Sequence, residues 1–227
     1  MISNIFHVYI YAPILGALVF IYENMAFHDL GIAIAILTIA TRIILFPIFY
    51  KSAKDQTLMQ KIQPKMKEIQ EKFKGNKEAQ AQALMALYKE NNLNPFSGFL
   101  LLLVQLPIFL ALFQIFSREL SNVAFDSVAL FGLINLSEKS VVLAVIAAGL
   151  QYIQGKMALA TAGSGNNNPA ASIGKMMVII GPAITLVILF SLPSALGVYW
   201  IVSTLFSIGQ QVYINKKINE KSATEKK

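Results

Sequence analysis

The sequence predicts an all-α membrane protein: five transmembrane helices around a hydrophilic groove, with a cytoplasmic helical hairpin and an N-terminal interfacial amphipathic helix. Three observations lead to this fold class. Of the 227 residues, 56% are hydrophobic and 14% are charged, against roughly 25% charged in a soluble domain. Long apolar stretches alternate with lysine-rich ones. One apolar stretch has an arginine near its middle, which requires polar surroundings inside the protein.

The N-terminal stretch, residues 1–28, is apolar, contains several tyrosines and lacks Lys and Arg. Ile5–Tyr22 is barely long enough to span a bilayer, and Pro13 interrupts it. Tyrosines and a glutamate suit the level of the lipid headgroups. We therefore expect an interfacial helix on the outer surface, while a membrane-spanning helix remains the alternative.

The first predicted span, residues 29–52, contains the twenty-residue stretch Gly31–Tyr50. As a helix this stretch would be about 30 Å long, the thickness of the hydrocarbon core. Arg42 lies near its middle, where insertion scales assign an arginine roughly 2.5–3.5 kcal/mol. Pro47 can kink the last turn. Arg42 must therefore face water or polar groups inside the protein.

Residues 53–93 predict a charged, antiparallel helical hairpin on the cytoplasmic side. The segment is rich in Lys, Glu and Gln. Its apolar residues have helical spacing at Leu58, Ile62, Met66, Ile69 and Phe73. Gly75-Asn76 is typical of a turn, and Ala79–Tyr88 is a second helical run.

The remaining predicted spans are residues 94–117, 140–161, 172–191 and 194–215. An outer polar segment, 118–139, follows the second span, and a cytoplasmic loop, 162–171, has the flexible composition AGSGNNNPAA. The basic tail, 216–227, is expected to be disordered. Lysines mark the hairpin, the flanks of the loop and the tail as cytoplasmic. The N-terminus is then outside and the C-terminus in the cytoplasm.

Polar side chains occur at compatible depths in four of these spans, and each alone is well explained by hydrogen bonding between helices. However, the apolar parts of the spans contain no Asp or Glu, so Arg42 cannot form a simple ion pair there. We therefore predict a water-filled groove, open to the lysine-rich side and closed by apolar residues at the other end. The candidate groove residues from depth and helical spacing are Thr38, Arg42, Gln105, Gln151, Gln154, Trp200, Ser203 and Thr204.

Four stretches carry a family resemblance: LTIATRIILFPIFYKSAKDQTLMQKIQPKMKEIQEKF, NNLNPFSGFLLLLVQLPIFLALFQIF, GLQYIQGKM and LPSALGVYWIVSTLFSIGQQ. With them the chain closely resembles the Oxa1/YidC/Alb3 family of membrane protein insertases in its five-span bacterial form. The resemblance covers about Gly31 to Lys217. One departure is Thr204, where many relatives carry asparagine. The family's groove arginine falls on Arg42, and the threonine that partners it falls on Thr38. The family's third-span glutamine falls on Gln154, and its fifth-span aromatic pair falls on Tyr199 and Trp200.

The resemblance implies a function without enzymatic activity or cofactor. Such proteins take nascent membrane proteins from ribosomes, alone or beside the Sec translocon, and release them sideways into the lipid bilayer of the bacterial plasma membrane. The implied partners are these clients and the ribosome, with no specific DNA. The chain has no G-x-x-x-x-G-K-[ST] motif for a nucleotide.

The alternative function is an anion or small-solute transporter or channel that uses Arg42 as its binding site. The long lysine-rich hairpin argues against it, as does the lack of internal repeats and of intramembrane acids. An intramembrane protease fits less well, because the chain has no H-E-x-x-H motif and both histidines precede the first predicted span.

Overall fold

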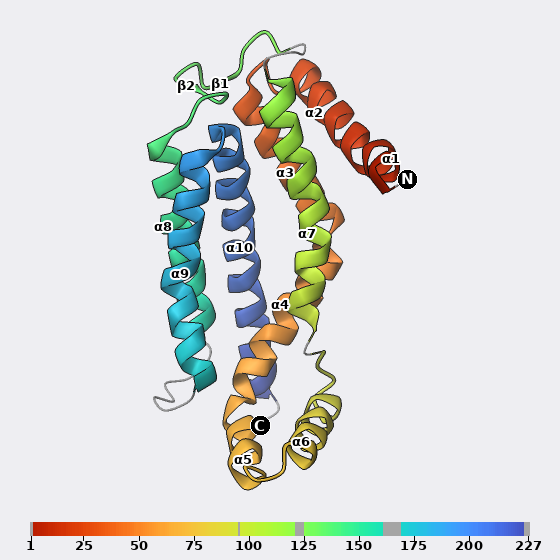
Figure 1. Cartoon of the computed structure of the whole chain (residues 1–227), viewed down its shortest axis with the longest axis vertical. Helices are drawn as coiled ribbons and strands as arrows, with labels where there is room; N and C mark the ends of the chain where they lie inside the picture. Colours follow the sequence, from red (N-terminus) through yellow and green to blue (C-terminus); the bar gives the residue numbers. More distant parts are fainter. Residues whose placement is uncertain (1, 95, 121–124, 161–168, 225–227) are drawn as a thin grey trace.

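The computed structural model describes residues 2–94, 96–120, 125–160 and 169–224. The molecule is mostly helical: long helices form a bundle with a helical hairpin at one end and a small β-hairpin at the other (Figure 1). We call these the hairpin end and the strand end. The prediction of a helical protein is therefore confirmed.

The N-terminal segment forms one helix inclined to the bundle (Figure 1). Helix α1 (Ile2–Phe6), the π-helix η1 (His7–Tyr11) and α2 (Ala12–Asn24) follow each other without a break. Among the described helices, Asn4–Asn24 is the one that is by itself long and apolar enough to cross a membrane. The interfacial position of residues 1–28 stays a prediction.

The first predicted span is divided at Leu45 into α3 (Leu30–Ile44) and α4 (Phe46–Lys61), and the two helices are bent by 70°. Asp29 caps α3, since its Oδ1 accepts a hydrogen bond of 2.9 Å from the Ile32 amide. Pro47 lacks an N–H, and its ring would crowd the carbonyl of Ile43 in a continuous helix, whereas the first turn of a new helix accommodates it without this cost. Arg42 consequently lies in the last turn of α3.

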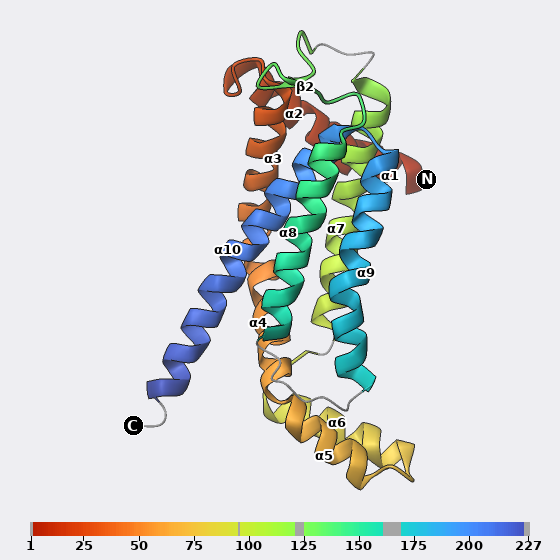
Figure 2. The ribbon, with the colours of Figure 1, turned by 90° about the vertical axis from the view of Figure 1, so that its left-hand side faces the viewer.

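The hairpin end consists of α4 and the antiparallel pair α5 (Gln63–Lys72) and α6 (Lys77–Glu90) (Figure 2). Asn76 caps α6 by accepting hydrogen bonds from the amides of Glu78 and Ala79 at 3.1 and 3.0 Å. The Gln80 side chain donates to the Gln70 carbonyl across the pair at 3.0 Å.

Three further long helices complete the bundle: α7 (Ser97–Gln114, continued by the π-helix η2, Ile115–Glu119), α8 (Val141–Ala160) and α9 (Pro169–Ser191). The final helix, α10 (Ser194–Thr224), is longer than the predicted fifth span. The expectation of a disordered tail at 216–227 is therefore wrong as far as Thr224. Most of the predicted loop 162–171 lies outside the described residues.

The segment between α7 and α8 contains two short strands that the sequence did not reveal. Strands β1 (Ala129–Leu130) and β2 (Ile134–Asn135) pair antiparallel, with Leu130 opposite Ile134. After β2, the carbonyls of Leu136 and Glu138 accept the amides of Ala195 and Ser194 at 3.1 and 2.8 Å. These bonds satisfy the first donors of α10 and fix its start at the strand end.

The hydrophobic core is concentrated toward the strand end, where α2, α3, α7, α8 and α10 meet. Fully buried side chains there include Leu18, Leu30, Ile34, Ile115, Leu136 and Leu196. Helix α8 packs against α9 and α10, and α4 packs against α7. The apolar parts of the later helices, Leu103–Arg118, Val141–Met157 and Val178–Ser191, are shorter than a full span.

Candidate functional site: a polar groove between five helices

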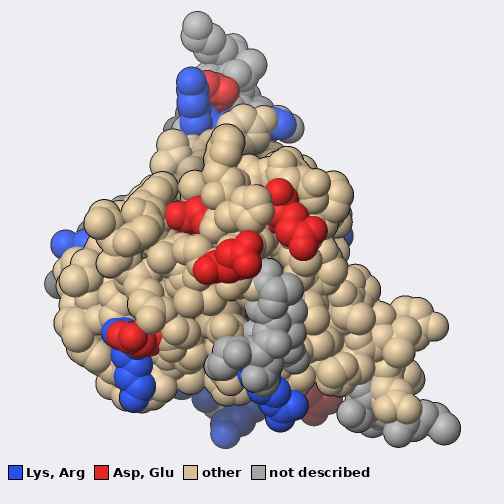
Figure 3. Space-filling view, turned by 90° about the horizontal axis from the view of Figure 1, so that it is seen from above, with Lys and Arg blue, Asp and Glu red and all other residues tan. Residues whose placement is uncertain are grey.

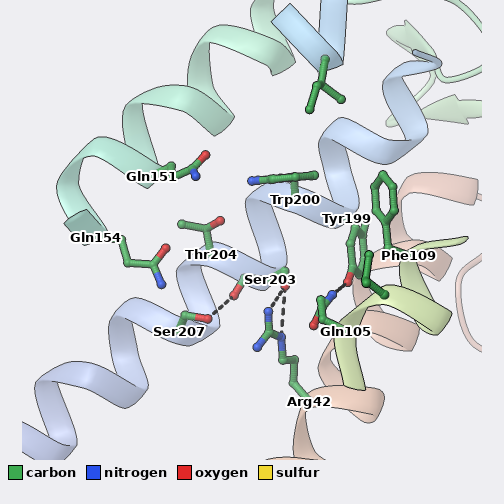
Figure 4. A pocket seen from close by; sticks show the side chains of 12 residues that line it. Arg42, Gln105, Phe109, Gln151, Gln154, Tyr199, Trp200, Ser203, Thr204 and Ser207 are labelled. Atoms are coloured by element: carbon green, nitrogen blue, oxygen red, sulfur yellow. Dashed lines mark hydrogen bonds between the residues drawn. The ribbon is translucent and has the colours of Figure 1, made fainter. Parts of the chain in front are cut away.

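Below the core, five helices surround a cavity of about 350 Å³ (Figure 4). Helices α3, α7, α8, α9 and α10 all contribute to it. Its lining consists of Arg42, Gln105, Leu106, Phe109, Gln151, Gln154, Ile188, Tyr199, Trp200, Ser203, Thr204 and Ser207.

A second cavity of about 330 Å³ shares four of these residues: Arg42, Gln105, Gln154 and Ser207. It extends toward the hairpin end, where glutamines dominate its lining. The additional residues are Phe49, Ala53, Gln56, Leu101, Gln210 and Gln211. We call the two cavities together the groove. Its polar character increases from the core toward the hairpin.

Arg42 is the charged residue in the lining of the groove, whose described residues include no Asp or Glu. Its Nε donates to the Ser203 Oγ at 3.1 Å, and its Nη2 donates to the same oxygen. The guanidinium carbon lies 4.4 Å from the centre of the Phe49 ring, within the range of a cation–π interaction. The Nη1 donors have no partner among the described residues, so they can serve water or an incoming acceptor.

A chain of polar contacts connects three helices at the level of Arg42. The Gln105 amide of α7 donates to the Tyr199 hydroxyl of α10, and Tyr199 lies one helical turn before Ser203 on the same face of α10. Ser203 in turn holds Arg42 of α3 (Figure 4). The position of the guanidinium is therefore set by neutral groups, which leave its positive charge uncompensated.

Aromatic and aliphatic side chains close the groove toward the core. Trp200 meets Phe109 edge to face, with ring centres 6.0 Å apart and planes at 89°. Leu106 and Ile188 complete this apolar end. The closed end lies toward the strand end, where the hydrophobic core begins.

Eight of the nine side chains predicted to form the groove do line it: Arg42, Gln105, Gln151, Gln154, Tyr199, Trp200, Ser203 and Thr204. Gln151 is also tied to α9, because it accepts a hydrogen bond from Thr185. Thr38 is the exception. It is 2% exposed and donates to the Ile34 carbonyl of its own helix at 2.6 Å, so it supports α3 one turn before Arg42.

Several lining residues were not among the candidates chosen from the sequence. Ser207 and Gln211 belong to the polar stripe that the spacing indicates on the fifth span, so they were detectable from it. Phe49 and Gln56 were not, because the bend at Leu45 brings α4 beneath the groove. Among the described residues, no group of three or more His, Cys, Asp or Glu could hold a metal ion.

Comparison with known proteins gives a consistent result. The family described as 60Kd inner membrane protein matches residues 20–221. The chain is 37% identical over 210 residues to the membrane protein insertase YidC of Geotalea uraniireducens, covering 91% of this chain and 37% of that protein. It is 37% identical over 209 residues to the protein of the same name from Syntrophus aciditrophicus, with 90% and 36% covered. The chain thus spans little more than a third of these relatives, and it belongs to the family of the 60Kd inner membrane protein.

Proposed function

We propose that this protein is a membrane protein insertase. In this proposal, the groove receives a polar segment of a nascent membrane protein from the cytoplasm, and the client leaves sideways into the bilayer. The protein acts on some clients alone and on others beside the Sec translocon. The proposal includes five spans in a bacterial plasma membrane, with the N-terminus outside.

One observation carries this proposal: a guanidinium that has no carboxylate partner among the described residues faces a polar groove that reaches from mid-bundle to the hairpin end. A charge in the middle of a membrane is tolerated when it borders water or a polar ligand. Because Ser203 occupies only part of the guanidinium, Arg42 can bind a client carboxylate or backbone carbonyl.

The energetic argument concerns the polar end of the client, which must cross hydrocarbon. A groove that holds water to the depth of Arg42 shortens this crossing. Burial of the client's apolar span in lipid then supplies the free energy, at about 25 cal/mol per Å². The process needs no nucleotide.

The charge distribution fits this orientation. Seen from the strand end, acidic side chains gather near the middle of the molecule and basic ones lie mostly toward its edge (Figure 3). Lysines are frequent in α4–α6 at the opposite end, as expected for a cytoplasmic face. This basic face is the proposed contact for the ribosome, whose RNA phosphates attract Lys and Arg.

The first experiment replaces Arg42 by alanine. The purified variant is reconstituted into liposomes and tested with a Sec-independent client whose translocated tail carries carboxylates. We expect insertion to fall by about tenfold or more, because a charge-assisted hydrogen bond is lost. Full insertion of the acidic client by Arg42→Ala would overturn the charge-capture mechanism.

Two comparisons make this test specific. Arg42→Lys retains the charge but not the planar fork of donors. If this variant is partly active, the part of the insertion activity that it lacks depends on the guanidinium geometry. The same client with its tail carboxylates changed to amides is expected to depend less on Arg42. The alternative of an anion or solute transporter gains no support, since the relatives reported above are named insertases.

A further inference from the structure

A separate pocket of about 250 Å³ lies outside the groove, where α4 crosses the start of α7. The two helices pack side by side there (Figure 1). The Ser52 hydroxyl joins them by donating to the Ser97 carbonyl at 2.9 Å. The pocket is lined by Pro47, Ile48, Lys51, Ser52, Asp55, Asn94, Ser97 and Leu100.

The lining has the same polarity order on both helices. Along α4 toward the hairpin, it runs from Ile48 through Lys51 to Asp55, on one helical face. Along α7, which runs in the opposite direction, polar Ser97 comes before apolar Leu100. The apolar end of the pocket thus faces the bundle, and its carboxylate lies at the hairpin end.

Two buried polar atoms in this lining have no hydrogen-bond partner within the described part of the chain: the Asp55 Oδ2 and the Ser97 Oγ. Both residues are only 5% exposed. A buried carboxylate oxygen without a donor is unfavourable, and the Ser97 hydroxyl can still donate a hydrogen bond. The pocket therefore suits a ligand that carries both a hydrogen-bond donor and an acceptor.

We propose that this pocket binds the headgroup of a phospholipid with a primary ammonium, of the ethanolamine type. The ammonium would donate to Asp55, and the phosphate would lie between Lys51 and the hydroxyl of Ser97. An acyl chain would follow Ile48 and Leu100.

The order of groups in such a lipid matches the order of the lining. From the membrane outward, the lipid presents acyl chain, phosphate and ammonium, and the pocket presents apolar side chains, Lys51 and Asp55. The exposed side chains of Leu100, Leu103 and Leu110 continue from the pocket along one face of α7, and they offer a track for the acyl chain. The placement of this pocket at the level of the cytoplasmic lipid headgroups rests on the five spans of the proposed function.

The carboxylate distinguishes this lipid from others. A primary ammonium has three N–H donors, whereas the quaternary ammonium of a choline headgroup has none. A glycerol headgroup brings no positive charge to Asp55. A divalent metal ion is a poor alternative, since Asp55 is the one carboxylate in the described lining.

The test is native mass spectrometry of the full chain in detergent with an equimolar mixture of ethanolamine, choline and glycerol phospholipids that carry identical acyl chains. We expect about tenfold more retained ethanolamine lipid than choline lipid. Asp55→Asn, which keeps the side-chain shape, is expected to abolish this preference. Equal retention of the ethanolamine and choline lipids by the unmodified protein would refute the site.

Matched variants separate the pocket from general surface charge. Glu71→Gln removes an exposed acid of α5, and Lys54→Gln removes a lysine outside the pocket lining. Both variants are expected to leave the preference unchanged. Lys51→Gln is expected to lower retention of ethanolamine and choline lipids alike, since both carry a phosphate. A preference that survives Asp55→Asn, or an equal loss in Glu71→Gln, would contradict the proposal. Asp55 lies outside the groove, so this result is independent of the insertion assay.

Discussion

At the scale of single residues, the Ser203 hydroxyl accepts both hydrogen bonds that orient Arg42. We expect Ser203→Ala to destabilise the protein by up to about 1.5–3 kcal/mol, the range for hydrogen bonds to charged groups. Water in the groove would reduce this value. The measurement is unfolding in detergent, followed by circular dichroism.

Ser207→Ala is the matched control for this variant, since its hydroxyl lines the same groove but donates to the Ser203 carbonyl of its own helix at 3.0 Å. The control is expected to change stability by less than about 0.5 kcal/mol. Equal effects of the two variants would show that Ser203 does not hold the guanidinium.

Asp55 predicts a pH-dependent stability. Burial raises the pKa of this carboxyl, and the nearby Lys51 and Lys54 together with a backbone hydrogen bond at Asn94 offset part of the rise. The folded state therefore binds the proton more tightly than the unfolded state, so stability falls as the pH rises from the unfolded pKa through the folded one.

Without added lipid, we expect Asp55→Asn to raise the thermal midpoint at pH 7, and we expect this gain to shrink as the pH approaches 4. Thermal unfolding across this pH range, with Glu71→Gln as control, measures the effect. A gain that stays constant with pH would contradict the assignment to this carboxyl.

At the scale of elements, the bend at Leu45 decides which side chains enter the groove from α4. Pro47 lies in the first turn of α4, and the Leu45 carbonyl accepts the amides of Ile48 and Phe49, both at 3.1 Å. Pro47→Ala restores the missing donor and removes the collision with the preceding turn. We therefore expect the 70° bend to decrease and the hairpin to move relative to α3.

Distances between spin labels on α3 and α5 report this movement. Pro107→Ala in α7 is the control, because that helix continues through its proline. An unchanged distance in Pro47→Ala would assign the bend to the packing of α4 on α7 instead.

Gly31 allows α3 to pass close beneath the β-hairpin. A Cβ at this position would overlap with the Leu130 side chain of β1. The same hairpin is held by Asp29, whose Oδ2 accepts the Phe131 amide at 2.5 Å. We expect Gly31→Ala to loosen the β-hairpin and to speed amide hydrogen exchange there. Gly16→Ala in α2 is the control, since nothing lies within 4 Å of its added Cβ.

These elements also show what could be read from the sequence. Depth and helical spacing were sufficient for Arg42, Gln105 and Gln154, because both quantities are local properties of a helix. They were insufficient for Phe49, which reaches Arg42 only through the bend. The strands were missed because two residues are too few to show alternation.

The end of α10 illustrates the same limit. Composition predicted a disordered tail after residue 215, yet Ile218 is buried and Lys217 lies 5.8 Å from the rings of both Tyr50 and Tyr213. The contact with Tyr50 joins this end of the helix to α4. Amino-acid composition alone does not reveal tertiary contacts of this kind.

At the scale of the whole molecule, the groove predicts a gradient of water access. The chain has no cysteine, so each introduced cysteine is the only thiol. In inverted membrane vesicles, a membrane-impermeant maleimide is expected to label Gln56→Cys fastest, Ser207→Cys more slowly and a cysteine at Trp200 slowest. Leu112→Cys, in a core position that is 2% exposed, is the unlabelled control. Uniform labelling, or none at Ser207, would contradict a groove open at the hairpin end.

The uneven distribution of the core has a mechanical consequence. The helices pack closely together near the strands, while their opposite halves enclose the groove. Under the proposed function, a client would enter by spreading these halves, while the packed region near the strands would stay closed to water. Relaxation of the flexed helices would then favour release of the client, and the protein would return unchanged to accept the next one.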